Sequence, residues 1–123
     1  MATVPLDPSP PIAPASTARA DAVAAQWVAL HAAAGLVAGL AGHAAAASAL
    51  ATAPCPDSLL RARGWRLALA EQGLADTAAI LEGGIRALLV ARTGGAAVQG
   101  AADALWQEFL DARQALVELA RPL

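Results

Sequence analysis

The stretch GLADTAA at residues 73–79 decides between two helical folds, because it repeats the pattern of GLAGHAA at residues 39–45. Gly73 stands 34 positions after Gly39. Glycine is the preferred residue just after a helix end, and Asp and Gly are both accepted as N-caps. Each stretch therefore predicts the end of one helix, a short turn and the start of the next.

The composition around these stretches favours helix over strand. Hydrophobic residues make up 58% of the 123 residues, but aromatic residues only 3%, and Ala dominates the rest. Ala has the lowest cost of helix formation, whereas a run such as AAAA at residues 44–47 is poor strand sequence. The sequence therefore predicts an all-α fold with a single core.

Two short breaks, PCP at residues 54–56 and TGG at residues 93–95, divide the chain into three long helical segments. The predicted segments are residues 18–53, 58–92 and 96–119. The last has the clearest pattern, because its apolar residues recur every three or four positions with acidic residues between them. If the first two segments contain no further break, the fold is a bundle of three long helices.

A repeat of 34 residues with two helices per unit resembles the tetratricopeptide repeat (TPR). The resemblance implies a short TPR-like α-solenoid of helical hairpins, with units at residues 25–58, 59–92 and from 93 to the end. The small residues at the helix crossings of the three units would be Ala44, Ala78 and Ala112. The sequence leaves both folds open, the TPR-like solenoid and the bundle of three long helices.

Residues 1–18 are predicted to be a disordered, Pro-rich extension. Most prolines of the chain lie in this stretch, and proline lacks the amide donor that helix and sheet need. Ser16 or Thr17 would cap the first helix. Residues 19–123 would then form the helical TPR-like domain.

The sequence shows no pattern typical of an enzyme, and we expect no catalytic residues, no cofactor and no metal. His31 and His43 stand twelve positions apart, about a third of a turn around a helix axis, so they cannot bind one metal from one helix. The formal charge of -2, without a run of basic residues, argues against nucleic-acid binding. Cys55 is the single cysteine, which fits a cytoplasmic protein.

Residues 22–53 carry no charged side chain and exceed the roughly 20 residues that span a bilayer. Their Ala and Gly content gives little drive for insertion, which depends mainly on Leu, Ile, Phe and Val. We therefore expect a buried helix of a soluble protein. A membrane-associated helical hairpin is the alternative.

The predicted function is the binding of a partner protein that presents an apolar helix. In the solenoid, the first helix of each unit lines a concave face, and here that lining is almost wholly apolar. Arg63 would lie at its rim and orient the partner. The expected partner-binding residues are Ala33, Leu36, Leu60, Arg63, Trp65, Leu67 and Ala70.

Two alternatives to this surface remain open. The same leucines can form the ordinary core of a bundle. The chain can also be a self-associating structural protein, in which glycines let helices of different copies pack closely. The glycines in question are Gly35, Gly39, Gly83 and Gly84.

A narrower resemblance comes from PDSL at residues 56–59, WRLALAE at residues 65–71 and GL at residues 73–74. This segment resembles the centre of the small repeat-type chaperones of type III secretion needle subunits. The resemblance implies a cytoplasmic chaperone that covers the apolar C-terminal helix of the needle subunit and prevents premature polymerisation. It also implies a second small helical co-chaperone as a partner. Trp65, Leu67 and Leu69 would belong to the segment that shapes the groove.

Overall fold

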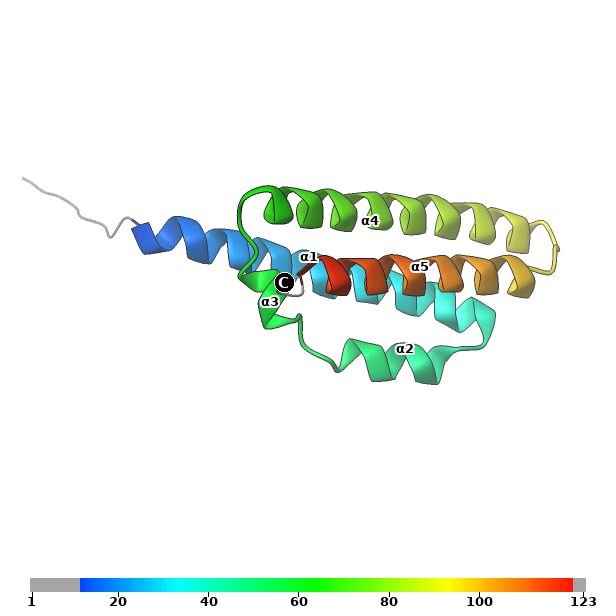
Figure 1. The fold of residues 1–123 in the computed structure, drawn as a ribbon. Coiled ribbons are helices and arrows are strands. Elements are labelled where there is room, and N and C mark those ends of the chain that lie inside the picture. Colours follow the sequence, from blue (N-terminus) through cyan, green and yellow to red (C-terminus); the bar gives the residue numbers. More distant parts are fainter. Residues whose placement is uncertain (1–11, 121–123) are drawn as a thin grey trace, which may run out of the picture.

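Three long helices form the body of the molecule, and each contacts the other two (Figure 1). They are α1 (Ile12–Ala41), α4 (Gly64–Thr93) and α5 (Gln99–Ala120). Two short helices, α2 (Ala44–Ala51) and α3 (Asp57–Leu60), lie on the connection from α1 to α4. The computed structural model describes residues 12–120, and the side chains of residues 18–119. The described part contains no strand, which confirms the predicted all-α class.

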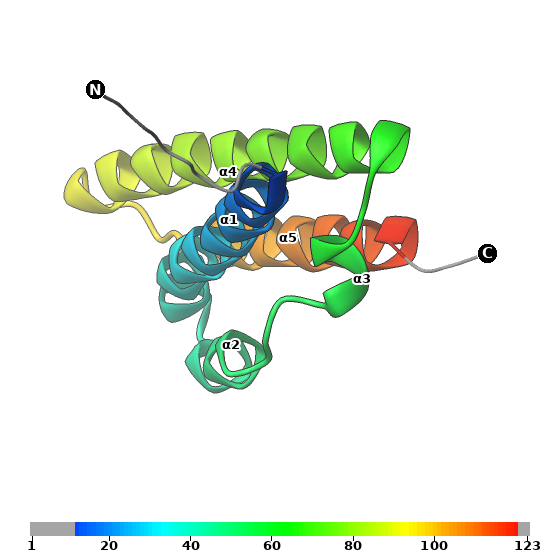
Figure 2. The same ribbon diagram turned by 90° about the vertical axis from the view of Figure 1, so that its left-hand side faces the viewer.

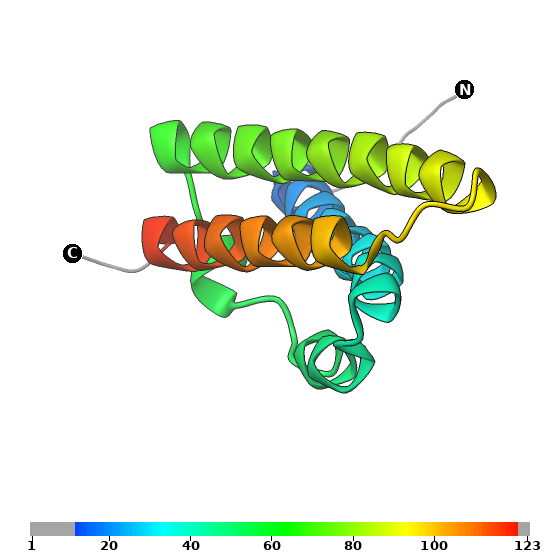
Figure 3. The same cartoon turned by 90° about the vertical axis from the view of Figure 1, so that its right-hand side faces the viewer.

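The connection through α2 and α3 determines the directions of the long helices. It returns the chain to the starting end of α1 before α4 begins, so α1 and α4 run parallel (Figure 1). The tight turn after Thr93 then makes α5 antiparallel to both (Figure 3). In Figure 2, α4 and α2 lie on opposite sides of α1, so α2 does not cover the side of α1 that faces α4.

The core is built where α5 meets the two parallel helices. Helix α1 contributes Val23, Trp27, Leu30 and Val37 at helical spacing, all at most 2% exposed. Leucines of α4 and the aromatic residues of α5 face them, and Leu59 of α3 is fully buried between the helices. The core residues contributed by α4 and α5 are Leu67, Ala70, Leu74, Leu81, Leu88, Ala102, Trp106, Phe109 and Leu116.

The first predicted break occurs in the structure. Helix α1 ends at Ala41, and Gly42 adopts φ +86°, the left-handed conformation that favours glycine. The amide of His43 donates to the carbonyl of Ala38 at 2.7 Å, which satisfies one of the last acceptors of the helix. Helix α2 then starts at Ala44, as the pattern predicts.

The second predicted break, at residues 73–76, is wrong, because α4 continues through it without interruption. Thr77 Oγ1 donates to the carbonyl of Gly73 at 2.7 Å, and Gln72 Nε2 donates to Asp76 Oδ1 at 2.8 Å, both within the helix. Gly73 instead gives room to α5: a Cβ at this position would lie 2.8 Å from Leu116 Cδ2. The glycine serves close helix packing and does not end the helix.

The TPR-like solenoid is not confirmed by this architecture. Residues 59–92, predicted as one helical hairpin, contain only the end of the short helix α3 and then nearly all of the single helix α4, which has 30 residues. Ala44 and Ala78, which were expected at helix crossings, are exposed. The described helices instead form the alternative arrangement, a bundle of three long helices with two short ones on a connection.

The start of α1 also differs from the prediction. The helix begins at Ile12, and Pro14 stands in its first turn, where a missing amide donor costs no hydrogen bond. Ser16 and Thr17 therefore lie inside the helix and do not cap it. Residues 1–11 of the predicted extension lie outside the described residues, as do residues 121–123 of the predicted domain.

Helix α1 contains a stretch, Ala18–Ala41, that is long and apolar enough to cross a membrane by length and composition alone. The core helix of a soluble protein meets the same criterion. One face of this stretch packs against α5 and α4, with Trp27 and Val37 nearly or fully buried.

Gly83 and Gly84 provide a test of the close approach between α4 and α5. A Cβ at Gly83 would meet no atom within 4 Å, whereas a Cβ at Gly84 would collide with the side chain of Leu105. Gly83→Ala should therefore raise the free energy of unfolding by about 1 kcal/mol, the usual advantage of Ala over Gly in a helix. Gly84→Ala should be the less stable variant by about 1 kcal/mol or more, because overpacking offsets that advantage. Urea denaturation of both variants measures the difference, and equal stabilities would contradict the packing.

Candidate partner-binding surface

Three hollows are lined by residues of both α1 and α4. The first, at the start of α4, is also bordered by α3, whereas the other two follow one another along the contact between α1 and α4. We call them the near, middle and far hollows, and the last two together the α1–α4 furrow. From Gln26 to Leu40 the furrow extends over about 20 Å, at 1.5 Å per helical residue.

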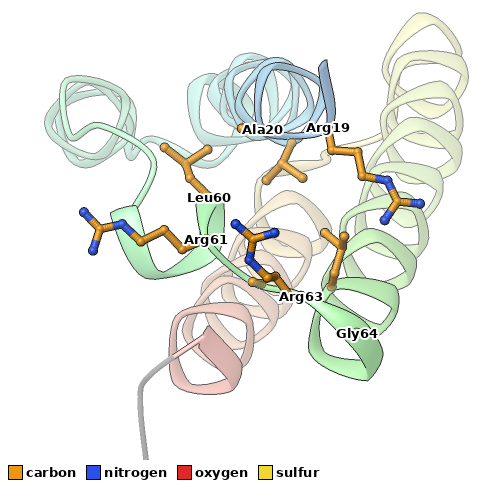
Figure 4. A pocket seen from close by; sticks show the side chains of 9 residues that line it. Arg19, Ala20, Leu60, Arg61, Arg63 and Gly64 are labelled. Carbon is orange, nitrogen blue, oxygen red and sulfur yellow. The ribbon is translucent and has the colours of Figure 1, made fainter. Parts of the chain in front are cut away.

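The near hollow, of about 400 Å³, lies where α1 passes the connection between α3 and α4 (Figure 4). Its floor is apolar and includes Val23, Leu60 and Leu67. Arg19 reaches from α1 towards α4, and Arg63 extends into the middle of the hollow, whereas Arg61 points outwards from α3 (Figure 4). The hollow therefore combines an apolar base with cationic side chains at its edge.

The middle hollow is small, about 140 Å³, because both helices present alanines there. Ala29 and Ala33 of α1 face Ala75 and Ala78 of α4, with Leu30 and Leu74 at the base. Small side chains on both helices leave the surface shallow, which allows the backbone of another helix to approach closely.

The far hollow, of about 350 Å³, is lined by larger apolar side chains. Leu36 is 62% exposed and Leu89 is 48% exposed, with Leu40 and Ile85 beside them. Gly35 and Gly39 also line it, and a Cβ at either glycine would meet no atom within 4 Å. These glycines therefore face open space and do not support packing within the described part of the chain.

A second apolar surface lies on the other side of α4. Trp65, Leu69, Ile80 and Val90 are between 47% and 70% exposed and fall on one side of the helix. The guanidinium of Arg66 lies 5.2 Å from the centre of the Trp65 ring, within cation–π range. We call this surface the α4 outer stripe.

The predicted partner-binding residues do not form one continuous surface. Leu60, Arg63 and Leu67 meet in the near hollow, Ala33 lines the middle hollow and Leu36 the far hollow. Ala70 is 1% exposed and belongs to the core. Trp65 lies on the outer stripe, because two positions along a helix correspond to about 200° of rotation from Leu67.

Sequence reasoning did not identify several residues that line the three hollows. Arg19 and Arg61 join Arg63 in the near hollow, and Ile85, Leu89 and Arg92 complete the far hollow. Helical periodicity alone could have placed Ile85, Leu89 and Arg92 on one face of α4, since their spacing is four and three. The pairing of that face with α1 has no signal in the sequence.

A cluster of ring side chains joins α1 to α5. His31 Nδ1 donates to the carbonyl of Trp27 at 2.8 Å, and His31 Nε2 accepts from Arg113 Nε at 2.9 Å. The His31 ring meets Phe109 edge to face at 5.4 Å, and the Arg113 guanidinium lies 5.1 Å from the Trp27 ring centre. Both ring nitrogens are used in these contacts, so His31 is held as a neutral imidazole in a packing role.

Burial lowers the pKa of His31 below its ordinary value of 6.5, and the positive charge of Arg113 lowers it further, while the bond to the Trp27 carbonyl opposes both effects. As the pH falls through 6.5, His31 therefore becomes protonated in the unfolded chain but stays neutral in the folded chain. The stability that this contributes is present above pH 6.5 and is lost as the pH falls towards the lowered pKa.

We expect the free energy of unfolding to fall between about pH 7.5 and 5.5, a range above the titration of ordinary carboxylates. His31→Gln keeps a donor and an acceptor but cannot titrate, so its free energy of unfolding should change less over the same range. Denaturant titrations at several pH values measure both slopes. An identical slope in the two proteins would contradict the role of His31.

Two further polar groups, His43 and Cys55, have defined surroundings. His43 Nε2 lies 2.5 Å from Asp103 Oδ1 and joins the start of α2 to α5. Burial, with a smaller effect from the charge of Asp57, raises the pKa of the Cys55 thiol to about 11, so the thiol stays protonated at neutral pH. Among the described residues, no three His, Cys, Asp or Glu side chains are placed to hold a metal ion.

Comparison with protein-family models, with curated proteins and with solved structures finds no match to this chain.

Proposed function

We propose that the chain binds an amphipathic helix of a partner protein in the α1–α4 furrow. The observation that carries the proposal is the furrow itself: two mainly apolar hollows between parallel helices, with Leu36 and Leu89 left largely exposed. Helix-in-groove recognition uses anchors of this kind, spaced along a partner helix at positions i, i+3, i+4 and i+7.

The dimensions of the furrow support a helix as the occupant. A helix of about 14 residues matches its length of about 20 Å. The alanine-lined middle hollow lets such a helix approach closely, while the larger far hollow accepts its bulky side chains. Covering the exposed parts of Leu36 and Leu89 contributes about 1 kcal/mol each, since full burial of a leucine is worth about twice that.

The role that we propose for this binding is that of a cytoplasmic chaperone without catalytic activity. A partner that polymerises through an apolar helix must keep that helix covered until assembly, and the furrow offers a cover of suitable length. The resemblance of residues 56–74 to the needle-subunit chaperones makes a type III secretion needle subunit the client that we propose.

A second surface is available for a co-chaperone. The α4 outer stripe presents Trp65 and three further apolar residues on a face of α4 that the furrow does not use. Exposed apolar patches on small proteins commonly mark protein-binding sites, and tryptophan is enriched among the residues that dominate such interfaces. We therefore propose that client and co-chaperone occupy different sides of α4.

Substitution of the furrow leucines tests the proposal. A fluorescein-labelled amphipathic peptide of about 20 residues, with a Leu and Ala stripe, serves as the probe. Leu36→Gln and Leu89→Gln should each weaken its binding by about fivefold, which corresponds to about 1 kcal/mol. Both positions are exposed, so the free energy of unfolding should change by less than about 0.5 kcal/mol. Fluorescence anisotropy and urea denaturation measure the two effects.

Val90→Gln is the matched control, because Val90 is 70% exposed and lies on the outer stripe. It should leave peptide binding unchanged. Equal weakening by all three substitutions would mean nonspecific adhesion and would overturn the proposal. If the free protein sediments as a stable dimer that Leu36→Gln and Leu89→Gln dissociate, the furrow is an interface between copies of this chain, and the chaperone role fails.

A further inference from the structure

The near hollow holds cationic side chains that no acidic residue neutralises. Arg19, Arg61 and Arg63 line it, and none of its lining residues is Asp or Glu. Among the described side chains, those of residues 18–119, no carboxylate lies at ion-pair distance from any of these three arginines. The side chains of Arg19 and Arg63 both extend over the hollow (Figure 4). Their like charges repel each other until an anion lies between them.

The backbone at the start of α4 favours the same kind of ligand charge. Gly64, the first residue of α4, lines the hollow, and no side chain caps the helix there. The first amides of a helix have no partner within it and carry a partial positive charge. A Cβ at Gly64 would meet no atom within 4 Å, so the space beside these amides is open to a ligand.

The floor of the near hollow is apolar. Val23 and Leu67 are buried and Leu60 is partly buried beneath it. Its volume of about 400 Å³ is typical of small-molecule sites, in which apolar walls surround a few polar groups that fix the orientation of the ligand. An inorganic anion would leave the floor uncovered, and a neutral apolar molecule would leave the arginines unpaired. The hollow therefore matches a ligand with an apolar body and an anionic group.

The far hollow is also apolar and contains an arginine, but its charge is different. Arg92 is its single cationic residue, and it lies in the last turn of α4. The final carbonyls of a helix carry a partial negative charge, and α1 ends beside the same hollow. These carbonyls oppose an anion at the far hollow, whereas the first amides of α4 favour one at the near hollow.

We propose that the near hollow binds a small amphiphilic anion. Its carboxylate or phosphate group is held between Arg19 and Arg63, and its apolar chain or ring lies on Val23, Leu60 and Leu67. Arginine binds both kinds of oxyanion through paired N–H groups in a fixed plane. The site is separate from the α1–α4 furrow and does not depend on the proposed function.

Decanoate and decyl phosphate are the probes, because each joins an apolar chain to one of the two anionic groups. Decanol has the chain without the charge, and inorganic phosphate has the charge without the chain. In NMR titrations of the full chain, below the concentrations at which the probes form micelles, at least one amphiphile should shift the amide signals of Gly64 and Leu67 to saturation. Decanol and inorganic phosphate should bind about tenfold more weakly, since each lacks one of the two contacts.

Arg19→Gln and Arg63→Gln should each weaken binding of the preferred amphiphile by about fivefold, the upper value for an exposed ion pair, and leave decanol binding unchanged. Arg92→Gln is the matched control, because it removes an arginine from an apolar hollow at the other end of α4. It should leave amphiphile binding unchanged. All three arginines are exposed, so the midpoint of urea denaturation should stay the same in each variant.

Four results would overturn the proposal. Decanol that binds as tightly as the amphiphiles would mean apolar adhesion alone, and inorganic phosphate that does so would mean a general anion contact. Equal weakening by Arg92→Gln, or amide shifts centred on Leu36 and Leu89, would place the ligand elsewhere. Leu36→Gln, which tests the furrow, should leave amphiphile binding intact, so the two sites can fail independently.

Discussion

Helix α5 holds the other two long helices in place, and the rest of the structure depends on this packing. Phe109 of α5 meets the ring cluster of α1 around His31, while Leu116 and Leu105 pack against Gly73 and Gly84 of α4. The aromatic residues thus contact α1, and the glycines let α4 approach α5 closely. With α5 on one side only, the described residues leave the opposite side of the α1 and α4 pair as a furrow.

The distribution of side-chain size explains why this furrow suits a partner. The large aromatic side chains of the core, Trp27, Trp106 and Phe109, lie at the contact between α1 and α5. The contact between α1 and α4 is therefore left with smaller side chains. Alanines line the middle hollow of this contact, and leucines are exposed in the far hollow. A helix from another protein can supply the large apolar side chains that fill these hollows.

Helical periodicity predicted much of the fold. The repeat of apolar residues over 96–119 places α5 within a few residues of its observed start. The glycines at residues 39–42 predict the end of α1 within a few residues, although Gly42 and not Gly39 follows the last helical residue. The same reasoning failed at Gly73, because a glycine after a helix end and a glycine at a close helix contact look alike in sequence. The difference lies in Leu116, a residue far along the chain whose side chain occupies the space that a Cβ would need.

The candidate surface was predictable only in part. The sequence by itself determined that the chain is helical, that its helices carry apolar faces, and that Leu36, Leu60, Arg63 and Leu67 belong to such faces, since these properties follow from local spacing and side-chain chemistry. Only the tertiary structure decided that α1 and α4 run parallel, that Trp65 lies apart from Leu67, and that Arg19 joins Arg63 in one hollow. The physical reason is that the packing of α5 and the path of the connection through α3 bring these residues together, and neither is encoded in the pattern of a single helix.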